Sequence, residues 1–184
     1  MSFNGDLNSS DEGTDLTTKG QIHTFSTENT ALDVGSNTNV LTADSSEATG
    51  LAWLDAGSIN HEVTLLVACS DEDTAIDATG QKLSFRMPTA MTLNAGSAGI
   101  KGSLVTAGTG ANLLTVDINE GGSTILSTKL TFDATETTTT TAAVPVVISD
   151  INLAADSIIT IDVDQLDSGG VAAGLKIALI GKSV

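Results

Sequence analysis

The segment 112–123, NLLTVDINEGGS, joins an alternating strand pattern to a hairpin turn. Leu114, Val116 and Ile118 recur at every second position with polar residues between them, so their side chains share one face of a strand. The stretch NEGGS that follows (119–123) has the paired glycines of a tight hairpin turn. These residues predict antiparallel β-structure with one buried and one solvated face.

Most of the chain after about residue 60 shows the same alternation of apolar and polar residues. Two further segments place apolar residues on one face by alternation: Leu83, Phe85 and Met87, and Ile159, Ile161 and Val163. The predicted strands cover residues 61–68, 82–88, 90–95, 100–107, 112–119, 123–132, 142–149, 157–166 and 173–181. Such a series of short strands predicts an all-β fold, an antiparallel β-sandwich of jelly-roll type with almost no helix.

Local signals refine this prediction at two places. Pro145 has no backbone N–H to donate, so the strand that contains it is predicted to be an edge or to begin at the proline. The threonine-rich run 135–143 is predicted to be a loop that enters an exposed strand.

The first 57 residues differ from the rest of the chain. Residues 1–17 are mostly polar and cannot bury enough surface to fold alone, and residues 18–55 read as short extended pieces separated by turns. We therefore predict an N-terminal arm and short β-rich stalk (1–57) followed by a C-terminal sandwich (58–184). The apolar residues of the first region need a surface supplied by another copy of the chain. The predicted trimer or docking interface consists of Phe3, Leu7, Phe25, Leu32, Val40, Leu41, Leu51 and Trp53.

Charge and hydropathy argue against several functional classes. The formal net charge of −16 repels nucleic-acid phosphates and anionic lipid headgroups, so neither nucleic acid nor a membrane is an expected partner. The longest apolar runs, such as 63–68 and 144–148, are far shorter than the roughly 20 residues of a membrane-spanning helix. The N-terminal sequence has no secretory signal pattern, and we expect the protein to be made in a cytoplasm.

The sequence points to no catalytic, cofactor or metal site. Cys69 lies in an apolar run and is expected to be a buried thiol, and His23 and His61 have no paired ligand nearby. The acidic loop 70–77 offers Asp71, Glu72, Asp73 and Asp77 as oxygen ligands for calcium, but their spacing fits no EF-hand and a solvated loop is favoured. A glycan-cleaving enzyme would need a carboxylate pair flanked by aromatic residues, and the chain has no tyrosine.

Residues 18–53 resemble a motif of tail-fibre and other surface structural proteins of tailed bacteriophages. The motif reads TKGDL, then a hydrophobic residue with VG, then VLxADS, then GLxW. Here it is carried by Lys19, Gly20, Val34, Gly35, Val40, Leu41, Ala43, Asp44, Ser45, Gly50, Leu51 and Trp53. Gln21 stands where the motif has aspartate. Residues 83–181 are also similar to a β-rich module at the C-terminus of phage structural proteins.

This resemblance implies trimers built from interwound short strands. It also implies a non-enzymatic structural protein on the virion surface, made in the cytoplasm of a bacterial host. We expect a capsid decoration or head-fibre protein whose arm docks on the major capsid protein or another virion protein. The alternative is a short tail fibre that binds the host surface.

Overall fold

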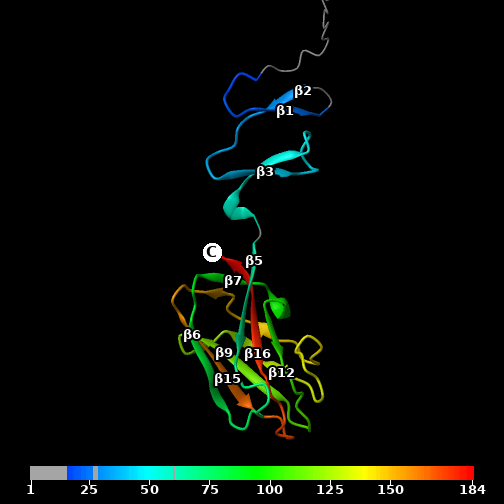
Figure 1. The fold of residues 1–184 in the computed structure, drawn as a ribbon, viewed down its shortest axis with the longest axis vertical. Coiled ribbons are helices and arrows are strands. Elements are labelled where there is room, and N and C mark those ends of the chain that lie inside the picture. The colour runs from blue at the N-terminus through cyan, green and yellow to red at the C-terminus, as the bar shows by residue number, and fades with distance from the viewer. Residues whose placement is uncertain (1–15, 27–28, 60) are drawn as a thin grey trace, which may run out of the picture. The chain divides into compact units, whose positions relative to one another are not determined.

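The computed structural model describes residues 16–26, 29–59 and 61–184 (Figure 1). It divides the chain into an N-terminal unit, up to residue 60, and a C-terminal unit, His61–Val184. Strands account for nearly all regular structure in these residues, with two short 3-10 turns, η1 (Ala56–Ser58) and η2 (Gly96–Ala98). The predicted all-β fold without α-helix is therefore confirmed for the described ranges. None of their helical turns is long and apolar enough to cross a membrane.

The N-terminal unit contains two antiparallel hairpins. β1 (Ile22–Phe25) pairs with β2 (Asn29–Leu32), and β3 (Asn39–Ala43) pairs with β4 (Leu51–Asp55). The turn of the second hairpin is closed by Asp44, whose Oδ1 accepts hydrogen bonds from the Ser46 hydroxyl at 2.6 Å and the Ser46 N–H at 2.9 Å. Both bonds hold the pKa of Asp44 below its usual range, and the bond from the Ser46 hydroxyl has the larger effect.

The C-terminal unit is built from two five-stranded antiparallel sheets. Sheet I has the order β10–β9–β15–β6 with β12 also paired to β9, and sheet II has the order β14–β7–β16–β5 with β8 also paired to β16. The strands of sheet I are β6 (Gly80–Arg86), β9 (Leu114–Glu120), β10 (Ser123–Thr124), β12 (Leu130–Phe132) and β15 (Ile158–Gln165). The strands of sheet II are β5 (Glu62–Ala68), β7 (Met91–Leu93), β8 (Ile100–Ser103), β14 (Asn152–Leu153) and β16 (Lys176–Ser183). A separate pair is formed by β11 (Leu126–Thr128) and β13 (Val147–Ile148).

Both sheets contribute side chains to one apolar core. Val116 and Ile118 of β9, Ile161 of β15, and Ile177 and Leu179 of β16 are all fully buried. Burying one such side chain stabilises the fold by about 1.5–3 kcal/mol relative to leaving it exposed. The predicted faces of β6, β9 and β15 are thus confirmed, because their alternating apolar residues all belong to this core or pack against it.

The turn predicted after β9 is also present. Gly121 and Gly122 both have positive φ, 57° and 87°, between β9 and β10. A two-residue turn with both φ values positive suits the twist of an antiparallel hairpin, and glycine adopts it without strain.

The segment 123–132 differs from the prediction of a single strand. It divides into β10, β11 and β12, because Ile125 and Leu126 are both buried although they are consecutive. A continuous strand would turn one of them to the outside. The strand predicted at 142–149 is shorter than expected and begins at Val147, two residues after Pro145. The threonine-rich run before it is a loop, from which Thr139 is buried against β8 and accepts a hydrogen bond from Gly102 N–H at 2.9 Å.

Four long loops lie at one end of the C-terminal unit because of the directions in which its strands run. β5, β8 and β12 run toward this end, and β16 begins there, so it collects residues 69–79, 104–113, 133–146 and 166–175. We call it the loop end. The start of β5 and the C-terminus lie at the opposite end (Figure 1).

Candidate functional site

The indole of Trp53 connects the two hairpins of the N-terminal unit. Its Nε1 donates a hydrogen bond to the carbonyl oxygen of Asp33 at 2.7 Å. The ring lies against Gly35 so closely that a Cβ at that position would be 2.7 Å from the indole Cγ and Cδ2. Only glycine fits between the chain after β2 and the ring on β4. Gly35 and Trp53, both positions of the phage motif, are therefore in direct contact.

A turn before β1 makes a second connection of this kind. Gln21 N–H donates to the Thr18 carbonyl at 3.2 Å, Gly20 has φ of 90°, and a Cβ on Gly20 would lie 3.1 Å from Val34 Cγ2. The Gln21 side chain accepts hydrogen bonds from the N–H groups of Thr17 and Thr18 and donates its own N–H to Asp33. An aspartate at position 21 could accept but not donate, so the departure from the motif has a local explanation.

In the N-terminal unit, none of residues 16–26 and 30–59 is buried. Of the residues predicted to form its interface, Phe25 is 66 % exposed and Val40 is 42 % exposed. The half-buried members of the predicted set are Leu32, Leu41, Leu51 and Trp53. Phe3 and Leu7 lie outside the described residues. The unit thus brings six of the eight predicted residues into two linked hairpins, and their contact with another copy stays a prediction.

The β3–β4 hairpin has apolar side chains on both faces. Leu41 lies opposite Trp53 on the face covered in part by Gly35, and Val40 lies opposite Leu54 on the other. Val40 and Leu54 are each 42 % exposed. A two-stranded hairpin covers at most one of its faces by itself. Leu54 was not among the predicted interface residues, because its pairing with Val40 depends on a register that the sequence does not reveal.

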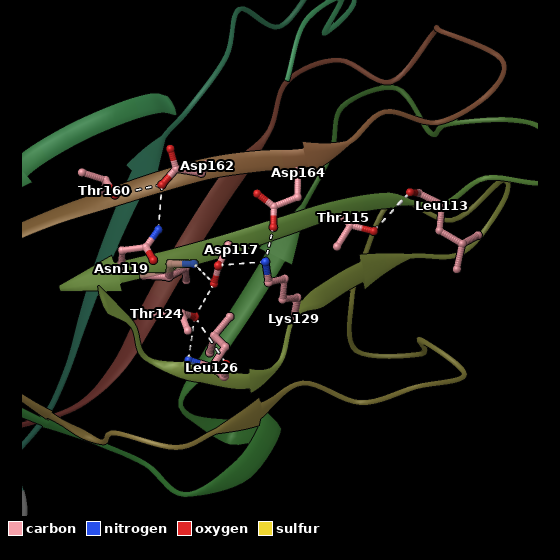
Figure 2. A network of polar contacts seen from close by, with 11 residues as sticks. Leu113, Thr115, Asp117, Asn119, Thr124, Leu126, Lys129, Thr160, Asp162 and Asp164 are labelled. Atoms are coloured by element: carbon pink, nitrogen blue, oxygen red, sulfur yellow. Dashed lines mark hydrogen bonds and ion pairs between the residues drawn. The ribbon is translucent and has the colours of Figure 1, made fainter. Parts of the chain in front are cut away.

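The outer face of sheet I carries a closed polar network (Figure 2). Asp117 of β9 is only 6 % exposed, and its carboxylate accepts hydrogen bonds from Ile118 N–H at 2.8 Å and the Thr124 hydroxyl at 2.5 Å. Lys129 lies 3.1 Å from the second oxygen of Asp117 and also pairs with Asp164 of β15. Both carboxylates hold the pKa of Lys129 above its usual range, and Asp164 has the larger effect. The three groups thus neutralise much of one another's charge within the protein.

The same network resolves a potential repulsion between neighbouring strands. Asp162 of β15 lies directly opposite Asp117 of β9, a position where two like charges destabilise a sheet. Asp162 accepts hydrogen bonds from Asn119 Nδ2 at 2.7 Å and the Thr160 hydroxyl at 2.9 Å. The sequence pattern correctly places these aspartates on the face away from the core. It does not predict that Asp117 is buried, because the partners that cover it come from a later segment.

The acidic loop after β5 uses its carboxylates in local contacts. Asp71 Oδ1 accepts hydrogen bonds from the N–H groups of Asp73 at 2.9 Å and Thr74 at 2.8 Å, which hold the pKa of Asp71 below its usual range. Glu72 forms an ion pair with Lys176. In the part of the chain that the structure describes, no group of three or more His, Cys, Asp or Glu side chains is arranged to hold a metal ion.

Cysteine and histidine side chains occupy unrelated positions. Cys69 is buried, and burial raises the pKa of its thiol to about 12, so at neutral pH it is a thiol and a poor nucleophile. His23 is exposed on β1, and His61 is exposed at the start of the C-terminal unit.

Asp167 joins two loops at the loop end. The residue is 4 % exposed, and its carboxylate accepts hydrogen bonds from Thr109 N–H at 3.0 Å and from the N–H groups of Val171 and Ala172 at 3.4 Å. Burial alone raises the pKa of this carboxyl, but hydrogen bonds from the backbone of Thr109, Val171, Ala172 and Gly170 outweigh it and lower the pKa. Asp167 therefore stabilises the loop end in its charged form.

Replacing Asp167 with asparagine should weaken the C-terminal unit in a pH-dependent way. Asp167→Asn is expected to lower the free energy of unfolding at neutral pH by about 1–3 kcal/mol, because an amide oxygen is a weaker acceptor than a carboxylate. The pKa of Asp167 is lower in the folded state than the unfolded value of about 3.9, so this stabilisation is present above that value and is lost as the pH falls through the folded-state pKa.

Urea unfolding of wild type and variant at about pH 7 and about pH 3 measures this effect, and the difference should shrink at the lower pH. Asp77→Asn changes an exposed carboxylate of a neighbouring loop and serves as the control. A difference that is equal at both pH values would show that the charge of Asp167 is not what stabilises the loops.

Gly35→Ala tests the contact with the indole. The new methyl group would overlap the ring, so Trp53 must move and the N-terminal unit should lose about 1–3 kcal/mol of stability. Trp53 is the single tryptophan, and its fluorescence reports the change directly. The emission maximum should move to longer wavelength, whereas Gly57→Ala in the same unit should leave it unchanged. An unaltered spectrum in Gly35→Ala would contradict the packing of the indole described above.

No protein-family model matches this chain, and no curated protein sequence matches it. Its function is therefore inferred from the sequence motif and from the contacts of the described residues.

Proposed function

We propose that this protein is a non-enzymatic structural component of a bacteriophage virion surface. The observation that carries the proposal is the agreement between the motif and the contacts of the N-terminal unit. Gly20 lies against Val34 and Gly35 lies against Trp53, and each of these four residues is a motif position. The motif residues are thus the ones that hold the two hairpins together. This supports the view that the motif encodes a structural unit and that its presence in this chain is not a chance match.

We further propose that the protein is a homotrimer held together by its N-terminal unit. Phe25, Val40 and Leu54 are large apolar side chains that one copy leaves at least 42 % exposed. Two linked hairpins without a buried residue lack the apolar interior that offsets the entropy of ordering them. Neighbouring copies supply that missing surface in a trimer of interwound strands, the arrangement implied by the family that the chain resembles.

The C-terminal unit is proposed to be a jelly-roll-like β-sandwich that forms the projecting head. Its two five-stranded sheets contribute to one core, which supports two sheets packed face to face. The residues of the first region, including Phe3 and Leu7, are proposed to dock on the major capsid protein or another virion protein. In this arrangement the protein is a capsid decoration or head-fibre protein.

A short tail fibre that binds the host is the second candidate. The gathering of four loops at one end favours it, because binding residues are often carried on loops held by a rigid scaffold. These loops contain seven acidic residues and no lysine, arginine or aromatic residue. Aromatic residues and arginine supply most strong anchors in recognition sites. Their absence from the loop end favours the decoration or head-fibre role.

Immunogold labelling of intact virions separates the two candidates. Label spread over the capsid in electron micrographs is expected for a decoration or head-fibre protein. Label confined to the tail tip would support the host-binding fibre instead. Turnover of host polysaccharide by the purified protein would contradict both and would indicate an enzyme.

The trimer predicts a defined mass in solution. One chain is 18.6 kDa, so light scattering should give about 56 kDa for the purified full-length protein. Trp53→Ala removes both the indole hydrogen bond and the ring between the hairpins. Because neighbouring copies complete the burial of this ring in the proposed trimer, the loss should cost about 3–5 kcal/mol and shift the protein toward monomer. Val144→Ala, at an exposed position of the C-terminal unit, should leave the mass unchanged. A wild-type protein of 18.6 kDa would overturn the trimer.

A further inference from the structure

The two sheets of the C-terminal unit differ in how their long edge strands are protected. Sheet I ends in β6 and sheet II ends in β5, and each of these seven-residue strands has a single neighbour among the described strands. An open strand edge presents unpaired N–H and C=O groups that attract strands of other chains.

The edge of β6 is protected by charge and irregularity. Met87 N–H donates to the Ser157 carbonyl at 2.9 Å, so Met87 and every second residue before it direct their backbone groups toward β15. Alternation then directs the backbone groups of Ser84 and Arg86 away from the sheet. Arg86 is basic, and the basic residue Lys82 lies where the register with β15 shifts, between Leu83 and Gln81. Charged side chains and bulges are the usual means of blocking an edge.

The edge of β5 is less protected, because it has no register shift and Glu62 at its start is the one charged residue of the strand. Its register with β16 is unbroken from Glu62 opposite Lys182 to Ala68 opposite Lys176. Cys69 N–H donates to the Leu175 carbonyl at 2.7 Å, so alternation directs the backbone groups of Glu62, Thr64, Leu66 and Ala68 to the open side. All four of these residues are exposed, and in the described part of the chain no hydrogen bond to their backbone groups is present on that side.

Leu66 makes the outer face beside this edge apolar. It is 61 % exposed in the middle of β5, lies opposite Ala178, and has Ile180 as its diagonal neighbour on β16. The outer face of sheet I differs, because polar and charged side chains there bind one another (Figure 2). An exposed apolar strip next to an open edge is the surface that a second chain would cover.

The charges around β5 allow a second copy to approach. Lys182 lies opposite Glu62, Lys176 pairs with Glu72, and Lys101 lies opposite Ala178 on the same outer face. With Glu72 counted here, this face has a formal charge of about +1 in a chain of −16, whereas the loop end has six further acidic residues and no basic one. Two copies of the head repel each other least when they meet along faces of this kind.

We infer that the β5 strands of three copies lie side by side around the trimer axis, with Leu66 of each copy packed against Leu66 of its neighbours. This inference rests on the proposed trimer. Glu62 follows Ile59 by three residues, a length of chain that reaches at most about 11 Å. A trimer joined through residues 16–59 therefore keeps three β5 strands together at high effective concentration. Three β5 strands around one axis shield one another's edges from a further chain, and the copies touch through side chains because a single open edge cannot pair with two neighbours.

Disulfide trapping of the full-length protein tests the arrangement. Leu66→Cys in a Cys69→Ala background places one thiol per chain at the proposed contact. Two such thiols form a disulfide only when their Cα atoms come within about 7 Å. Mild oxidation should link up to two of the three chains of each trimer, seen as a dimer on a non-reducing gel. Ser84→Cys, in the same background, puts the thiol on the exposed and protected β6 edge and should remain unlinked.

Leu66→Asp gives an independent readout. It should raise the concentration at which the trimer dissociates about tenfold or more, whereas Ser84→Asp should not change it. The residue is exposed, so the head should fold normally, which circular dichroism checks.

The outcomes separate this inference from the proposed function. A trimer in which Leu66→Cys does not cross-link and Leu66→Asp is neutral would overturn the β5 contact and leave the trimer intact. The same neutral result combined with loss of attachment to virions would assign the edge to a virion partner and overturn the contact between copies. A monomeric wild-type protein would overturn both proposals.

Discussion

The structure of the C-terminal unit depends on one apolar core to which both sheets contribute. Fully buried side chains such as Val116, Ile161 and Leu179 alternate with outward residues on their strands, so core formation fixes which residues face outward. Burial at about 1.5–3 kcal/mol per large side chain is the main source of stability here. The single Cys69 excludes a disulfide within the chain, so packing takes the place of covalent cross-links in this unit.

The N-terminal unit has no comparable core, and this contrast gives the two units different physical roles. Its hairpins are positioned by a few specific contacts, chiefly the Trp53 indole against Gly35 and the Gln21 side chain with Asp33. Such contacts define a shape but bury little surface. In the proposed trimer, other copies of the chain complete the interior that these hairpins lack. The C-terminal unit has an interior of its own, and in the same proposal it projects from the assembly.

Local patterns predicted the strands well and the pairing poorly. The alternation at Leu114, Val116 and Ile118 and the glycine turn that follows are properties of adjacent residues, and the sequence predicts them correctly. The break between Ile125 and Leu126, both buried, depends on contacts with distant segments, so alternation within 123–132 misses it. The same limit applies to the candidate interface. Trp53 is conspicuous as the single tryptophan, whereas Leu54 becomes relevant only when the register opposite Val40 is known.

The polar face of sheet I and the open edge of β5 show that exposure alone does not identify a contact surface. Asp117, Asp162 and Asp164 are a conspicuous acidic group, yet Lys129, Asn119 and nearby hydroxyl groups satisfy them within the chain. A second chain could bind there only by disrupting hydrogen bonds that already exist. The backbone edge of β5 and the side chain of Leu66 have no such bonds to lose. Association at β5 therefore removes apolar surface from water without breaking internal contacts, and this difference makes β5 the stronger candidate for a subunit contact.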